Sequence, residues 1–219
     1  MIVVVGQPLY QSSPDGDAVD GPATRIAVAA AGRGCRVQFV GKVGDDPEGD
    51  ALVLALTRDG VGHSALLRDP GMRTPVSTTL REDAEGPDEA VGATADGGSS
   101  VPPTRSNLDP ADVDLALRYL AEFGVLVLAD AVEPQVVRVV AGAASWGEAR
   151  LIVVVGPGDI VPDGLPPDAI VFEAPDADPD GVFAALVGSF AAALDDGGDA
   201  AEAFRASIQT DGWTALPRN

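Results

Sequence analysis

The chain has few of the side chains that most often build disulfides, metal sites and catalytic triads. Its 219 residues include one cysteine, one histidine and one lysine, and aromatic residues make up 5%. A single cysteine, Cys35, excludes an internal disulfide and fits a reducing cytosol. The single histidine, His63, has no Cys or second His nearby with which to bind zinc or form a triad. We therefore expect structural roles for both residues, with His63 at the surface or at a strand edge, beside the start of a strand.

Long apolar runs and an excess of positive charge are also absent. No segment approaches the roughly 20 apolar residues that span a bilayer. The opening stretch MIVVVG lacks the basic region of a signal peptide. The net charge of −20 repels the phosphates of nucleic acids and anionic lipids. These features predict an acidic, cytoplasmic protein that binds neither nucleic acid nor membrane.

Short β-branched runs alternate with helical patterns along most of the chain. Runs that are apolar on both faces are typical of strands buried between helix layers, and their alternation with helices favours a parallel sheet. We therefore predict an α/β fold whose central, mainly parallel sheet lies between helices. The expected strands are 2–5, 37–40, 125–129, 151–155 and 169–172, and the expected helices are 22–32, 47–58, 110–122 and 133–145.

Other segments depart from this alternation. Residues 74–94 form two alternating runs around an acidic turn, which predicts a β-hairpin. Residues 95–107 are a polar linker. Two further helices are expected in DPDGVFAALVGSFAAALDDGG and DAAEAFRASIQ, the first of them buried against the sheet. The glycines at 153–164 lack the spacing of a dinucleotide site and predict a turn.

The stretch FVGKVGDDPEGDAL, residues 39–52, raises the question of a ligand site. Asp46 followed by a proline and an acid has the form of a helix start. Gly41 and Gly44 would let the preceding strand turn tightly into that helix. A structural interpretation thus covers every residue except Lys42, for which a solvated charge is the simplest explanation.

The surroundings of this stretch carry a more specific pattern. DGPATRIAVAAAGRG precedes it, and LTRDGV and RDPGMRTPV follow it. Together, residues 20–80 resemble the N-terminal half of the ribokinase-like (PfkB) carbohydrate kinase family, with Gly21, Ala27, Gly34 and Gly44 in register with its first signature. The resemblance resumes at LDPADVDLAL and at LVGSFAAALDDGGDAAEAF.

The resemblance implies a single ribokinase-like domain over residues 1–219, with a small β lid built from about 11–20 and 74–94. Members of the family transfer the γ-phosphate of ATP, with Mg²⁺, to a hydroxymethyl group of a sugar or nucleoside. An Asp at the start of a helix acts as base, and backbone N–H groups there form an anion hole. The substrate-binding positions carried over are Gln11, Gly21, Arg25, Lys42 and Asp45.

The chain departs from the family at the residues that matter for chemistry. An early Asp is replaced by Gln11 and the signature Asn by Arg25, which cannot accept a hydrogen bond. The catalytic position is Ala184, which cannot take up a proton. The anion-hole positions are Gly181, Val182, Phe183 and Ala184.

Acidic residues stand where phosphate would bind. Asp178 and Asp180 place negative charge at the start of this helix, where they would stabilise it and repel a phosphate. They are also the only candidates for an alternative base. The Asn-Glu motif that organises Mg²⁺ in the family is reduced to Glu173, and the segment expected to form the adenine-binding wall is missing before the helix.

Three hypotheses follow. The first is a degenerate carbohydrate kinase homologue, a pseudokinase with weak or no phosphotransfer that retains binding of a small ligand such as a sugar or nucleoside, with no cofactor assigned. The second is an active sugar kinase that uses ATP and Mg²⁺ with Asp178 or Asp180 as base. The third is a non-catalytic structural or regulatory subunit that forms a homodimer through the edges of its lid strands.

Overall fold

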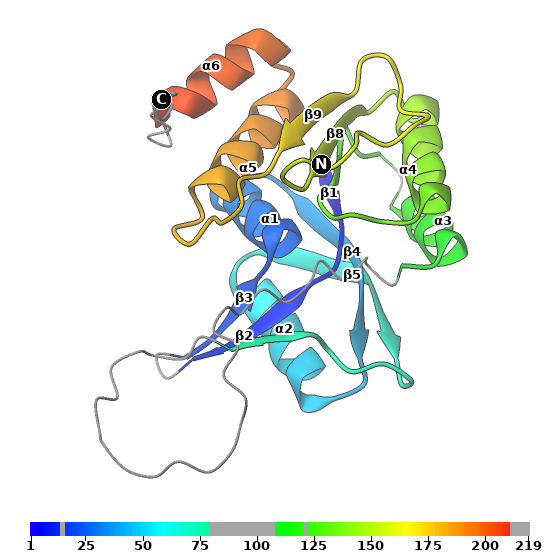
Figure 1. Ribbon diagram of the computed structural model, residues 1–219, viewed down its shortest axis with the longest axis vertical. Coiled ribbons are helices and arrows are strands. Elements are labelled where there is room, and N and C mark those ends of the chain that lie inside the picture. The colour runs from blue at the N-terminus through cyan, green and yellow to red at the C-terminus, as the bar shows by residue number, and fades with distance from the viewer. Residues whose placement is uncertain (14–15, 79–107, 121, 211–219) are drawn as a thin grey trace.

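A six-stranded sheet in the order β5-β4-β1-β7-β8-β9 forms the centre of the protein (Figure 1). The computed structural model describes residues 1–13, 16–78, 108–120 and 122–210. Every pairing in this sheet is parallel, so the predicted α/β fold is confirmed. The strands are β1 (Ile2–Val5), β4 (Val37–Gly44), β5 (Val61–Asp69), β7 (Val125–Leu128), β8 (Arg150–Val155) and β9 (Ile170–Glu173).

Helices cover both faces of the sheet. Because successive side chains of a strand point to opposite faces, Val4 packs with one layer and Val3 and Val5 with the other. The first layer contains α1 (Pro22–Gly32), α2 (Pro47–Arg58) and α5 (Val182–Asp195), with α6 (Ala200–Thr210) packed on α5. The second layer contains α3 (Pro110–Tyr119) and α4 (Pro134–Trp146).

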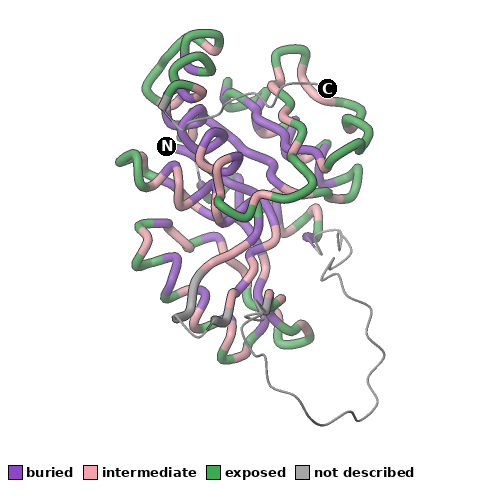
Figure 2. The backbone as a smooth tube through the Cα atoms, turned by 60° about the vertical axis from the view of Figure 1, so that its left-hand side comes forward, coloured by how far each residue is buried: buried purple, intermediate pink, exposed green. Residues whose placement is uncertain are grey.

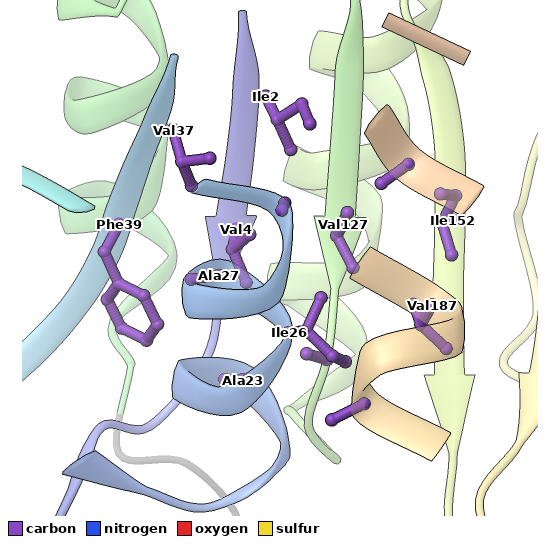
Figure 3. Packing of buried hydrophobic residues seen from close by; sticks show 14 of the residues in the cluster. Ile2, Val4, Ala23, Ile26, Ala27, Val37, Phe39, Val127, Ile152 and Val187 are labelled. Atoms are coloured by element: carbon purple, nitrogen blue, oxygen red, sulfur yellow. The ribbon is translucent and has the colours of Figure 1, made fainter. Parts of the chain in front are cut away.

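The contact between α1 and α5 is the tightest in the first layer. Both helices lie over the middle of the sheet, where Ala27 and Val187 face Val4 and Val127 (Figure 3). A Cβ atom added to Gly188 of α5 would lie 2.6 Å from the Cβ of Ala29 and 2.9 Å from the backbone of α1. The small residues of both helices therefore let their backbones approach closely. The sequence predicted that α5 would be buried against the sheet, and its close packing on α1 is a finding of the structure.

A second sheet of three strands, in the order β3-β2-β6, lies apart from the central sheet and next to α2 (Figure 1). Its strands are β2 (Leu9–Ser13), β3 (Gly16–Asp20) and β6 (Val76–Thr78). β2 pairs antiparallel with β3 and parallel with β6. The part of the predicted 74–94 hairpin beyond residue 78 lies outside the described residues, and within them the partner of β6 is β2.

Two expected boundaries differ from the structure by more than one residue. β4 continues to Gly44, so that Gly41 and Lys42 lie inside a strand and the turn comes only after Gly44. The helix expected over 110–122 ends at Tyr119. For β4 the pairing of its last residues with β5 decides the end, and local residue preferences do not record that contact.

Strand β5 was predicted only as a strand start beside His63, without its extent. Its sequence VGHSALLRD mixes polar and apolar residues, because it lies at the edge of the sheet and is only partly buried. The buried backbone is concentrated in the inner strands and the helix faces that cover them (Figure 2). In the described ranges, no helix combines the length and apolar character needed to cross a bilayer.

Replacing Gly188 by Ala should destabilise the protein, because the added methyl group meets the backbone of α1. Overpacking of this kind costs about 1–3 kcal/mol of unfolding free energy, which chemical denaturation would measure. The matched control is Gly142→Ala in α4, where a Cβ meets no atom within 4 Å. Since Ala stabilises an open helix position by about 0.5–1 kcal/mol relative to Gly, the two substitutions should have opposite signs. Equal effects would contradict the close packing.

Candidate functional site

The start of α5 is occupied by a carboxylate of the chain itself. Gly181 adopts a left-handed conformation with φ of 69°, which turns the preceding loop back over the helix end. The side chain of Asp178 then accepts hydrogen bonds from the backbone N–H of Phe183 at 3.1 Å and of Ala184 at 3.0 Å. Two of the donors that a helix start leaves free are therefore satisfied by Asp178.

Arg25 ties this loop to α1 and to the small sheet. Its guanidinium donates to the backbone carbonyl of Asp178 at 2.6 Å and forms an ion pair with Asp20 at 2.9 Å. Asp20 also accepts a hydrogen bond from Ser77 of β6 at 2.7 Å. Burial alone would raise the pKa of Asp20, but the hydrogen bonds from Ser77 and Gly21 and the charge of Arg25 outweigh it and lower the pKa.

An open cavity of about 370 Å³ lies beside this network. Its walls combine small apolar residues of α1 and α5 with the charged side chains of Arg25, Asp59 and Asp180. Ala184, at the position that the family resemblance assigns to the catalytic base, is only 2% exposed and carries no proton acceptor. The site offers one cation, already paired, and several acids.

The turn after β4 is explained by the hydrogen bonds of Asp46. Its carboxylate accepts from the N–H of Gly49 at 2.8 Å, and from the N–H and hydroxyl of Thr74 at 2.8 and 2.6 Å. Thr74 in turn accepts from the N–H of Gly44 at 3.0 Å. Asp46 thus caps α2 and holds the segment before β6 against it, as a structural turn would require.

The remaining predicted substrate residues lie apart from one another. Lys42 pairs with Asp112 of α3 at 2.9 Å, on the opposite side of the sheet from α5. Asp45, whose side chain is 65% exposed, faces Arg68 at 3.6 Å. Gln11 lies on β2 in register with Ser77 of β6. The structure therefore brings together Gly21, Arg25 and residues 178–184 of the predicted set, and leaves Lys42 and Asp45 elsewhere.

The described residues contain no group of three or more His, Cys, Asp or Glu side chains arranged to hold a metal ion. Glu173, the candidate metal ligand, accepts a hydrogen bond from the N–H of Gly158 at 2.8 Å and so holds the turn after β8. The acids around the start of α5 also do not fit the triphosphate of ATP, because they would repel it.

Sequence reasoning missed Asp130. It follows β7 at the carboxyl end of the sheet and accepts a hydrogen bond from the N–H of Gln7, which follows β1, at 2.5 Å. The chain adds β4 and β5 on one side of β1 and β7 to β9 on the other, so the β1–β7 gap is the switch point where open α/β sheets bind ligands. Burial raises the pKa of Asp130 to about 6. An Asp directly after the apolar run VLVLA was the available signal.

Known proteins resemble this chain both in sequence and in fold. Residues 21–128 match the family model described as pfkB family carbohydrate kinase. "Probable fructokinase-3" of Arabidopsis thaliana is 37% identical over 83 residues, which are 37% of this chain and 24% of the relative. The match thus spans about a quarter of the length of that relative.

Solved structures show the same architecture. Arabidopsis thaliana ribokinase in complex with ribose and ATP superposes with a TM-score of 0.61 at 15% identity, covering 96% of this chain and 90% of the ribokinase. A 2-dehydro-3-deoxygluconokinase from Thermotoga maritima has a TM-score of 0.51 at 17% identity, covering 70% of this chain and 50% of the kinase. At these identities the likeness establishes the ribokinase-like fold alone.

Replacing Asp46 by Ala should destabilise the protein, because it removes the α2 cap and the contacts to Thr74. Loss of such a cap costs about 0.5–2 kcal/mol of unfolding free energy, measurable by urea denaturation. Asp45→Ala, which removes an exposed acid one residue earlier, should change it by less than about 0.5 kcal/mol.

The effect of Asp46 should also depend on pH. Burial would raise the pKa of Asp46, but the hydrogen bonds from Thr74 and Gly49 together lower it below 3.8. Its contribution to stability is therefore present above about pH 4 and is lost as the pH falls through the folded-state pKa. The difference between wild type and Asp46→Ala should shrink in acid; a constant difference would contradict the role of the charged carboxylate.

Proposed function

Over residues 21–128 the chain belongs to the pfkB family of carbohydrate kinases and it has the ribokinase-like fold, and from this premise we propose that it is a degenerate member with weak or no phosphotransfer. It acts as a non-catalytic binder of a small sugar- or nucleoside-like ligand. Residues 1–219 form one ribokinase-like domain whose small sheet, β3-β2-β6, serves as the lid of that site.

The observation that carries this proposal is the engagement of Asp178 with the start of α5. The N-terminus of a helix attracts an anion, because its first N–H groups have no partner within the helix and its dipole is positive there. Here the donors of Phe183 and Ala184 already bind the Asp178 carboxylate. A transferring phosphate would have to displace a covalently attached anion, and it would meet the charge of Asp180 beside it.

The missing base supports the same conclusion. A positioned general base contributes about 10²–10⁴-fold to such a reaction, and Ala184 cannot supply it. The second hypothesis, an active kinase with a rearranged site, finds its best support in Asp180, because this acid lines the cavity beside Gly181 whereas both oxygens of Asp178 are engaged.

The outer strands of the small sheet offer a surface on which a second copy of the chain could bind. β3 and β6 are the outer strands of the small sheet, and outer strands offer unpaired backbone groups to a second copy. We therefore include a homodimer through these strands in the proposal. If light scattering at high protein concentration showed only monomer, the homodimer would be ruled out.

Purified protein incubated with Mg·ATP and a panel of sugars and nucleosides should form no product above the background rate. The reason is the combined loss of the base and of a free anion hole, the latter worth about 10²–10³-fold. An active sugar kinase assayed in parallel controls the conditions. Robust turnover that Asp180→Asn abolishes, with the fold intact, would replace this proposal by the active-kinase alternative.

Replacing Asp178 by Ala should open the start of α5 to an external anion. We expect the variant to lose about 0.5–2 kcal/mol of stability with its cap, and inorganic phosphate to raise its melting temperature in a saturable way. Wild type and the control Asp176→Ala, an exposed acid two residues earlier, should show no saturable shift. If phosphate stabilised all three proteins equally, Asp178 would not be the group that fills this position.

A further inference from the structure

A second cavity, of about 460 Å³, opens at the carboxyl ends of β7 and β8. It lies on the face of the sheet that α3 and α4 cover, whereas α5 covers the opposite face. Its walls are mainly aliphatic, from Leu128, Val132, Val137 and Val153, and its polar lining includes the carboxyl groups of Asp130 and Asp159. This cavity is therefore separate from the network around Arg25 and Asp178.

Asp130 is incompletely satisfied at the wall of this cavity. In the described part of the chain its Oδ2 accepts one hydrogen bond, from the backbone N–H of Gln7, and Oδ1 receives none. The surrounding elements carry Asp159 after β8, Glu133 at the start of α4, and the Lys42–Asp112 pair between β4 and α3. Lys42 is paired with Asp112, and Arg138 of α4 is exposed. Burial and the hydrogen bond from Gln7 act on the pKa of Asp130, with no contribution from a positive charge.

A partly buried carboxylate without a counter-ion is costly. Burial penalises its charged form, and this raises the pKa of Asp130 to about 6. Near neutral pH the ionised Asp130 lowers the stability of the fold. An Asn at this position could accept the same hydrogen bond from Gln7 without that cost. A ligand that supplied a positive charge would remove the penalty, since it would pair with the carboxylate in surroundings of low dielectric constant.

We propose that the cavity between Asp130, Asp159 and the aliphatic walls of β7, β8 and α4 binds a small organic cation, an ammonium group carried on an apolar body. The two acids recognise the charge and the valine and leucine side chains enclose the body. Anionic ligands are repelled by both acids and by the net charge of −20. The exposed Ile160 at the cavity lining would then be covered by the bound ligand.

A neutral hydroxylated ligand is the alternative occupant, and pH separates the two. A cation needs the ionised form of Asp130, so its affinity rises as the pH passes upward through about 6. At about pH 5 roughly nine tenths of Asp130 is protonated, which predicts about tenfold weaker binding than at about pH 7.5. A hydroxyl group can donate to the carboxylate or accept from the acid, so its binding should depend little on pH.

The experiment compares cyclohexylammonium with cyclohexanol, which share one body and differ in charge. Each is titrated at about pH 5 and about pH 7.5 in moderate salt, with binding followed by calorimetry and by the backbone amide signals of Gln7 and Asp130. Asp130→Asn keeps the acceptor for Gln7 and removes the charge, and Asp163→Asn, an exposed acid outside the cavity, is the matched control. Ala131→Leu fills the cavity from its exposed rim and leaves Asp130 intact.

We expect saturable binding of cyclohexylammonium that weakens about tenfold at the lower pH and is lost in Asp130→Asn and Ala131→Leu but kept in Asp163→Asn. Unliganded Asp130→Asn should also melt at a higher temperature than wild type at about pH 7.5, and by a smaller margin at about pH 5. The penalty of a raised acid pKa begins as the pH rises through the unfolded-state pKa and is complete only above the folded-state pKa of about 6.

Three results would overturn the proposal: no saturable binding of the cation, equal binding of cyclohexanol, or an equal loss in Asp163→Asn. None of them bears on phosphotransfer, so this site and the proposed function fail independently.

Discussion

The close contact between α1 and α5 is the constraint on which the rest of the molecule depends. The two helices can share the middle of the central sheet only because Gly188 lets the backbone of α5 approach Ala29 and Ala30 of α1. That approach brings the starts of both helices together, so that Arg25 of α1 reaches the loop that precedes α5. The small sheet is tied into the same place through Asp20 and Ser77. The ionic network around Arg25 therefore depends on the packing of α1 against α5, which the small residues of both helices permit.

The same arrangement decides what the site can do. Two helix starts that converge under a small sheet would attract an anion if their donors were free. In this chain the carboxylate of Asp178 satisfies the donors of α5, and Arg25 is held by Asp20 and by the backbone of Asp178. At the start of α5 the electrostatic features of a phosphate site are therefore present, and two of its donors are satisfied within the chain. The proposal of binding without transfer rests on this balance more than on the loss of any one side chain.

Much of the fold could be predicted because its signals are local. The apolar runs of β1, β7 and β8 are buried on both faces, and Asp46 and Asp109 cap their helices as the pattern of an acid followed by proline indicates. β5 was predicted only as a strand start beside His63, because an edge strand with one solvated side has no continuous apolar run. The length of β4 escaped prediction because its last residues pair with β5, a contact that no local preference records.

The candidate site was harder to predict because it depends on which distant residues meet. Gly21, Arg25 and the start of α5, which the resemblance assigned to one site, lie close together, and the capping role of Asp178 followed from its position near a helix start. The resemblance could not separate Lys42 and Asp45 from that group, because their partners Asp112 and Arg68 come from other elements. Asp130 was overlooked because its significance comes from strand order, which is known only once the sheet is assembled.

The extra length of β4 has a mechanical consequence. β1 ends at Val5, paired with Val40, whereas β4 and β5 continue together from Gly41–Leu66 to Gly44–Asp69. These last pairs form a two-stranded ribbon beyond the central sheet, and the pairing register shifts between Gln38 and Val40 at its base. Such irregularities bend and twist a strand locally. The ribbon leads into α2 and the small sheet, so it carries both of them beyond the carboxyl edge of the inner strands, and the pair of Lys42 with Asp112 of α3 fastens it to the body of the protein.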